Sequence, residues 1–254
     1  MNTIGVSCPD FCTTDFYEML ESISKDFSHW EIFSEADHMV QKVSGGFADR
    51  AEMYKMTFSI HTDISCVNIA AVNERMREAS VMEIVSEMEA AVEMGIDTLT
   101  VHPGIINLAV SGTRDRSVRS AKNSARFISR AANEYGLRVC MENMPNVPML
   151  IGTSVEELQE IVDGTDLGVT FDIGHANTLG MIDSMIDTFG DRIGNVHIHD
   201  NLGKRDDHLT LGEGNIDFLP IIRRLSRYKG RYIIESLDLL SAVESQKILK
   251  NMLQ

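Results

Sequence analysis

Eight short runs of apolar, largely β-branched residues recur along the chain, each followed by a loop and a segment of helical periodicity. The runs repeat about every 32 residues, the length of one strand–helix unit. Strands that alternate with helices predict an all-parallel sheet covered by those helices. Eight units therefore predict an α/β fold, a closed (β/α)8 TIM barrel, as one domain over residues 1–254. The predicted strands are Thr3–Ser7, Glu31–Ser34, Thr57–His61, Thr98–His102, Arg138–Glu142, Gly168–Asp172, Asn195–His199 and Tyr232–Glu235.

The segments between the runs carry apolar residues at the three- and four-residue spacing of an amphipathic helix. Two S-x-x-E patterns, SVME at residues 80–83 and SVEE at 154–157, predict capping boxes at helix starts. The clearest apolar stripe consists of Val81, Ile84, Val85, Met88 and Val92.

Composition excludes several classes of protein. The chain has 23 Lys and Arg residues against 38 Asp and Glu, a formal charge of −15. A strongly basic nucleic-acid module is disfavoured, because neutralising phosphates requires clustered Lys and Arg. No run approaches the roughly 20 apolar residues of a membrane span, and the start, MNTIGVSCPDF, does not read as a signal peptide. The four cysteines are scattered, which suits reduced thiols, so we expect a cytoplasmic protein without membrane contact.

Six consecutive predicted strands, from the third to the eighth, end in or next to His, Asp or Glu. In a (β/α)8 barrel these strand ends meet at the active face. Buried charges are costly unless they are paired or bound to a metal. Imidazole and carboxylate without thiolate suit Zn²⁺, Mn²⁺, Fe²⁺ or Co²⁺, and so many ligands indicate a cluster of two or three ions. The candidate metal ligands are His61, His102, Glu142, Asp172, His175, His197, Asp206, His208 and Glu235.

Three further residues are candidates for substrate binding. His199 follows His197 by two positions, so both side chains point to one side of the strand. Lys204 and Arg205 precede Asp206 on the next loop, where they could contact a phosphate or a hydroxyl group. A plain surface role for these two cations stays open.

Other polar residues are expected to have structural roles. The helix after the fourth run is rich in arginine, and a solvated helix face is the favoured interpretation. If one member binds a phosphate, we favour Arg114 or Arg116, which lie nearest the active face. His29 and His38 are predicted to lie at the surface, and Trp30 is predicted to pack in the core.

Seven motifs together make this sequence resemble a known superfamily over nearly its whole length. They are HTDISCVNIA (61–70), VHPG (101–104), MENMP (141–145), FDIGHAN (171–177), VHIHDN (196–201), DDHLTLGEGNIDF (206–218) and IIES (233–236). On these motifs the chain resembles the xylose isomerase-like barrels. That superfamily includes AP endonuclease family 2 (endonuclease IV) and the sugar-phosphate isomerases and epimerases.

The resemblance implies two different chemistries for one set of residues. In endonuclease IV nine residues hold three zinc ions, and carried over by position they fall on the nine candidate ligands above, with matching residue types. In the isomerases and epimerases a single divalent ion is held by the equivalents of Glu142, Asp172, His197 and Glu235. The two glutamates there also act as acid and base on either side of the sugar carbon.

Two departures from the endonuclease pattern favour the sugar chemistry. The loop after the second strand, which is basic and aromatic in the endonucleases, reads EIFSEADHMVQK and carries Glu35 and Asp37. The bulky aromatic residue expected three positions after His61 is Ile64. Bending a duplex and extruding a nucleotide require such wedges and phosphate contacts.

The leading hypothesis is therefore a metal-dependent sugar or sugar-phosphate isomerase or epimerase, with Glu142 and Glu235 as catalytic proton-transfer groups. It would use one to three Zn²⁺ or Mn²⁺ ions, no organic cofactor, and a small sugar as its partner. The alternative is an endonuclease IV-like trinuclear zinc phosphodiesterase that cleaves abasic-site DNA. A non-catalytic scaffold is the least favoured interpretation, and assembly into a homo-oligomer stays open.

Overall fold

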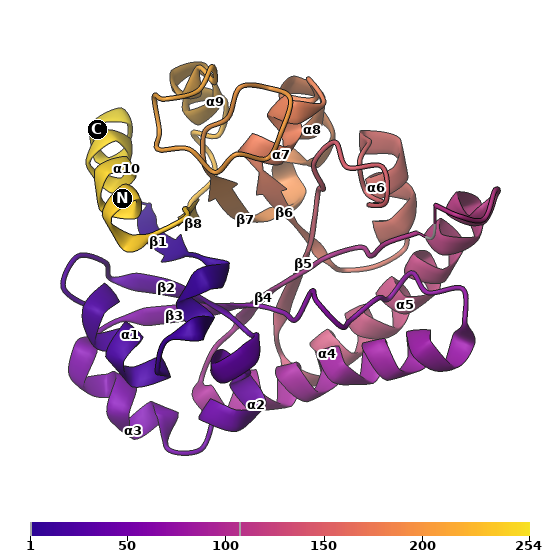
Figure 1. Ribbon diagram of the computed structural model, residues 1–254, viewed down its shortest axis with the longest axis horizontal. Coiled ribbons are helices and arrows are strands. Elements are labelled where there is room, and N and C mark those ends of the chain that lie inside the picture. The colour runs from indigo at the N-terminus through magenta and orange to yellow at the C-terminus, as the bar shows by residue number, and fades with distance from the viewer. Residues whose placement is uncertain (1, 107) are drawn as a thin grey trace.

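Each strand hydrogen-bonds in parallel to the strand that follows it in the chain, and the last strand pairs with the first. The sheet is thus the closed, all-parallel barrel of a (β/α)8 fold, which confirms the predicted fold class (Figure 1). The computed structural model describes residues 2–106 and 108–254. The strands are β1 (Thr3–Ser7), β2 (His29–Phe33), β3 (Thr57–His61), β4 (Thr98–Val101), β5 (Arg138–Glu142), β6 (Gly168–Asp172), β7 (Ile193–Ile198) and β8 (Arg231–Glu235).

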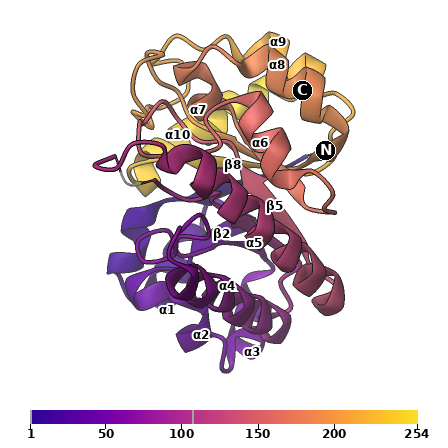
Figure 2. The same cartoon turned by 90° about the vertical axis from the view of Figure 1, so that its right-hand side faces the viewer.

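The helices surround the barrel and bury one face against it (Figures 1 and 2). The long helices α4 and α5 lie side by side along one flank. The predicted apolar stripe of α4 is buried from Val81 to Met88, whereas Val92 is 49% exposed. The α-helices are α1 (Phe16–Ile23), α2 (Val40–Val43), α3 (Phe47–Ala51), α4 (Glu74–Met94), α5 (Thr113–Tyr135), α6 (Val155–Val162), α7 (Ile173–Thr178), α8 (Ile182–Phe189), α9 (Phe218–Arg224) and α10 (Leu239–Met252). Among the described residues, none of these helices is both long and apolar enough to cross a membrane.

Of the two predicted capping boxes, the first is wrong and the second forms its serine half, while the Glu157 carboxylate accepts from the Gly152 and Thr153 N–H groups. Ser154 precedes α6, and its hydroxyl accepts a hydrogen bond from the Glu157 N–H. Ser80 instead lies inside α4, which begins two turns earlier behind the capping residue Asn73. The Ser80 hydroxyl accepts from the Asn68 N–H and so anchors the preceding loop to the helix. A serine hydroxyl can satisfy either kind of backbone donor, so the pattern alone did not locate the helix start.

Both histidines predicted at the surface are buried, so that prediction is wrong. His29 opens β2, two residues before the predicted start, and its ring nitrogens lie 2.8 Å from Thr57 Oγ1 and 3.0 Å from Ser59 Oγ. His38 lies 2.8 Å from the Thr14 carbonyl oxygen through Nε2. Burial of these three ring nitrogens is possible because their polar partners replace water.

A layer of polar side chains, here called the polar floor, crosses the barrel interior below the carboxyl ends of the strands. Barrel interiors are more often filled by branched apolar residues. Within the layer, Thr100 Oγ1 and Thr170 Oγ1 are 2.9 Å apart, and Asn195 Nδ2 donates to Thr100 Oγ1 over 3.2 Å. Its members, each 0% exposed, are Glu31, Ser59, Thr100, Thr170 and Asn195.

A buried glutamate outside the barrel makes stability depend on pH. Glu87 of α4 is 0% exposed, accepts from the Asp63 N–H over 3.1 Å, and has no hydrogen-bond partner for Oε2 among the described residues. Burial raises the pKa of its carboxyl to about 8. A raised carboxyl pKa in the folded state means that stability is lost as pH rises from the unfolded value, near 4.5, through about 8.

We therefore expect Glu87→Gln to be more stable than the wild type at pH 8 by roughly 1–4 kcal/mol, and to be similar at pH 4.5. For a chain of this size that corresponds to a melting temperature higher by roughly 2–16 °C. Thermal unfolding of both proteins across this pH range, with equal metal supplied, measures the difference. A stability difference between the two proteins that does not change with pH would contradict a raised pKa of Glu87 in the folded state.

Candidate metal centre

A buried group of one imidazole and three carboxylates occupies the middle of the active face. We call it the central group: Glu142 of β5, Asp172 of β6, His197 of β7 and Glu235 of β8. His197 Nδ1 lies 2.9 Å from Glu142 Oε1, 3.0 Å from Glu235 Oε1 and 3.9 Å from Asp172 Oδ2. None of these residues is more than 6% exposed. Ligand atoms from four strands thus converge on one small volume.

A second group shares Glu142 with the first. The His61 group comprises His61 at the end of β3, His102 just after β4, and Glu142. Glu142 Oε2 lies 3.3 Å from His61 Nε2 and 2.9 Å from His102 Nε2, whereas Oε1 faces the central group. The two carboxylate oxygens therefore face different groups, which is the arrangement of a bridging ligand between two cations.

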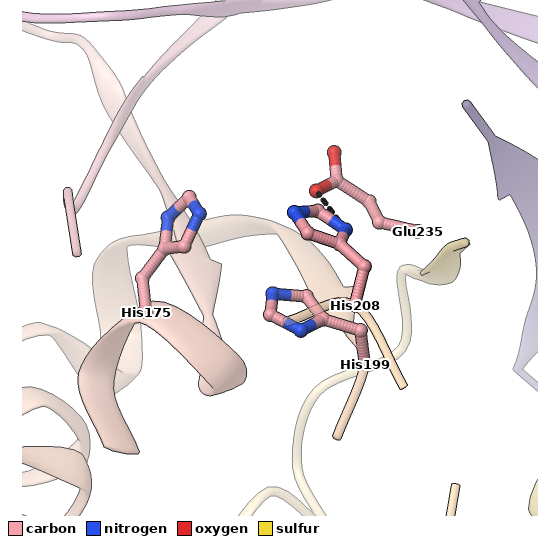
Figure 3. A group of neighbouring side chains, drawn as sticks. All are labelled: His175, His199, His208 and Glu235. Carbon is pink, nitrogen blue, oxygen red and sulfur yellow. Dashed lines mark ion pairs between the residues drawn. The ribbon is translucent and has the colours of Figure 1, made fainter. Parts of the chain in front are cut away.

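A third group, the His208 group, consists of His175, His199, Asp206 and His208. Asp206 Oδ2 lies 3.1 Å from both His175 Nε2 and His208 Nε2. Figure 3 shows the His175 ring facing the stacked rings of His199 and His208, with Glu235 beside His208. His208 has a φ of 48°, an uncommon left-handed conformation for a residue other than glycine. Such conformations cluster at functional sites.

Buried polar atoms without partners support the fit of cations to these groups. Asp172 Oδ2 has no hydrogen-bond partner among the described residues, and Asp206 Oδ1 and His199 Nε2, although 3.2 Å apart, do not meet hydrogen-bond geometry with each other or with any other described residue. Buried carboxylate oxygens are normally hydrogen-bonded or bound to a metal. Imidazole nitrogens and carboxylate oxygens are also the ligands that Zn²⁺ and Mn²⁺ prefer. The residues present therefore fit divalent cations in all three groups.

The pKa shifts of the ionisable residues in these groups also fit the binding of divalent cations. Burial opposes ionisation of Glu142, yet the facing His197, His102 and His61 hold its pKa well below the usual value. Burial likewise opposes protonation of His197, but Glu235, Glu31 and Glu142 raise its pKa well above the usual value. Without metal, protons thus provide the positive charge that the ionised carboxylates require, and a bound cation would displace them.

Backbone and side-chain acceptors orient three of the imidazoles. His61 Nδ1 lies 3.1 Å from the Thr62 carbonyl oxygen, and His175 Nδ1 lies 2.9 Å from that of Asn143. Each contact places a proton on Nδ1 and leaves Nε2 to face a carboxylate. His197 is reversed, since its Nε2 lies 2.6 Å from Glu31 Oε1 and its Nδ1 faces the central group. Such second partners set the tautomer and direction of a metal-binding histidine.

The structure brings all nine predicted ligands into these groups. The three predicted substrate-binding residues lie in different environments, one buried in the site and two exposed. His199 is buried, with Nε2 3.3 Å from Asp172 Oδ1 and 3.2 Å from Asp206 Oδ1. Lys204 and Arg205 are exposed on the loop that carries Asp206.

Arg114, named with Arg116 as a possible phosphate contact, pairs with Glu157 at 2.7 Å, which agrees with the structural role favoured for this helix. Glu31 of β2 was not among the candidates. A charged residue inside the apolar run HWEIF was the available signal.

Comparison with known proteins gives consistent results. The family model described as "Xylose isomerase-like TIM barrel" matches residues 26–252. An uncharacterised protein of Methanocaldococcus jannaschii is 34% identical over 98% of this chain and 89% of its own length. A crystal structure titled "D-tagatose 3-epimerase-like protein" superposes with a TM-score of 0.92 at 33% identity, covering 99% of this chain and 97% of that one. A probable endonuclease 4 of Acholeplasma laidlawii is 26% identical over 62% of this chain and 58% of its own length.

Proposed function

Since the chain belongs to the xylose isomerase-like TIM barrel family, we propose that it is a divalent-metal-dependent sugar or sugar-phosphate isomerase or epimerase. The observation that carries this proposal is the pair of buried glutamates on either side of His197 Nδ1, at 2.9 and 3.0 Å. Similarity over the whole chain to a structure titled as epimerase-like supports it. The net charge of −15 also favours a small sugar over a nucleic acid.

In this proposal the central group would hold a Zn²⁺ or Mn²⁺ ion, which when bound supplies Lewis-acid polarisation of the substrate carbonyl. The glutamates divide the proton transfer between them. Both oxygens of Glu142 have imidazole partners within hydrogen-bond distance. In contrast, Glu235 Oε2 lies 3.8 Å from His208 Nδ1, which is beyond hydrogen-bond distance. Glu235 is therefore the better base toward the substrate carbon next to the carbonyl. Glu142 is its acid–base partner on the opposite face of the substrate.

A specific observation favours phosphodiester cleavage as a second candidate. The His61 and His208 groups place six further candidate ligands around the central group, more than a one-ion isomerase requires. Two or three ions together stabilise the attacking and leaving oxygens of a phosphoryl transfer. The number of ions therefore separates the two candidates better than any single residue does.

Metal content and two assays test the proposal together. A candidate ketose panel that includes D-tagatose is incubated with the metal-loaded protein in D2O, and mass spectrometry follows deuterium entering a carbon-bound position. Abasic-site duplex DNA tests the alternative. Deuterium incorporation without DNA incision is the expected result. Incision with three zinc ions bound per chain, and no deuterium exchange, would replace the first candidate by the second.

Three variants assign the ions to the groups. If three ions bind, His102→Ala, Asp172→Asn and His208→Ala should each remove about one equivalent, because each variant changes a member of a different group. If one ion binds, Asp172→Asn alone should change the stoichiometry. Elemental analysis of each purified variant after dialysis gives the count.

A further inference from the structure

Glu31 lies outside the three groups but touches the imidazole at their centre. Its carboxylate is 0% exposed, and Oε1 lies 2.6 Å from His197 Nε2, on the ring edge opposite the nitrogen that faces Glu142 and Glu235. The mechanism above makes no use of this carboxylate. Burying a charged carboxylate costs free energy unless the carboxylate is paired and hydrogen-bonded.

The polar floor holds Glu31 rigidly in this position. Ser59 Oγ donates to Glu31 Oε2 over 2.7 Å, and Asn195 Nδ2 donates to the same oxygen over 2.8 Å. Behind Ser59, His29 Nε2 lies 3.0 Å from its hydroxyl. With Oε2 occupied by two donors, Oε1 remains for His197. These contacts join β2, β3 and β7 across the inside of the barrel.

We propose that Glu31 is a positioning residue, which keeps a proton on His197 Nε2 so that Nδ1 presents its lone pair to a cation in the central group. An ionised carboxylate accepts a strong, charge-assisted hydrogen bond from Nε2–H and makes the other ring nitrogen more basic. The same contact fixes the plane of the ring. The proposal rests on the metal site of the proposed function, but concerns affinity for metal and not the reaction catalysed.

Zinc affinity of the purified full-length chain tests the role without an activity assay. Glu31→Gln keeps the size of the side chain and removes its charge, and we expect it to weaken zinc binding about 10–100-fold. Ser59→Ala removes one of the donors that hold Glu31, and we expect a smaller loss, of several-fold. Competition with a chromophoric chelator measures each affinity. Glu87→Gln is the matched control, because it neutralises a buried glutamate of α4 that belongs to none of the three groups.

A spectroscopic measurement separates positioning from general loss of structure. In the zinc-loaded wild type, nitrogen NMR of the histidine rings should show one ring with a proton on Nε2 and metal on Nδ1. That signature should be perturbed in Glu31→Gln, while the circular dichroism spectrum stays that of the wild type.

Three results would overturn the proposal in distinguishable ways. Equal zinc affinity of wild type and Glu31→Gln would remove the positioning role and leave the metal centre intact. Loss of one whole equivalent of zinc, with the other sites unchanged, would make Glu31 a direct ligand. Absence of zinc and manganese binding by the wild type would overturn both this inference and the metal-dependent function.

Discussion

Replacing Glu142 by glutamine is expected to lower turnover by about 10²–10⁴-fold and to reduce the metal content of the protein. Glu142 is the one residue shared by the central and His61 groups, with Oε1 2.9 Å from His197 and Oε2 2.9 Å from His102. An amide cannot offer two anionic oxygens, so one substitution weakens both groups. Steady-state kinetics on the substrate found in the D2O screen, with elemental analysis, measure the two effects.

The control for Glu142→Gln is Glu87→Gln, which makes the same chemical change at a buried site in α4. It should keep wild-type turnover and metal content. A Glu142→Gln protein that retains full activity and a full complement of metal would show that Glu142 neither bridges cations nor transfers protons. That result would leave the shared position without a chemical role.

Removing metal by chelation is expected to cause the largest change in stability. The central group places three carboxylates around one imidazole in the barrel interior, and bound cations would neutralise them. A ligand at about 1,000 times its dissociation constant stabilises the folded state by about 4 kcal/mol. That corresponds to a melting temperature lower by roughly 8–16 °C after chelation. Differential scanning calorimetry before and after dialysis against a chelator measures the shift.

Restoring the metal completes this test. Zn²⁺ or Mn²⁺ added back in small excess should recover both the melting temperature and the activity, whereas Mg²⁺ should recover less, because it seldom recruits so many imidazoles. Lowering the pH should weaken the recovery, since protons compete for the same ligand atoms. A melting temperature that is indifferent to chelator and to added metal would contradict a structural contribution from bound cations.

The predicted strand ends carried most of the information about the site. His61, Glu142, Asp172 and Glu235 each terminate an observed strand, and a parallel barrel gathers such ends at one face. The periodic runs that define strands are local, so they are visible without coordinates. Strand starts were less certain, because His29 is polar and yet buried by partners on a neighbouring strand.

What could not be predicted is how the ligands are divided and supported. The nine ligands separate into groups because of which strand ends face one another across the barrel, as Glu142 faces both His102 and His197. Glu31 acquires its role from Asn195 and His197, which are more than 160 residues away in the chain. Order and type of residue along the chain determine the barrel and its candidate ligands, because periodicity and strand-end position are local. Tertiary structure alone decides which oxygen meets which nitrogen, because those contacts depend on barrel closure and on the buried hydrogen bonds inside it.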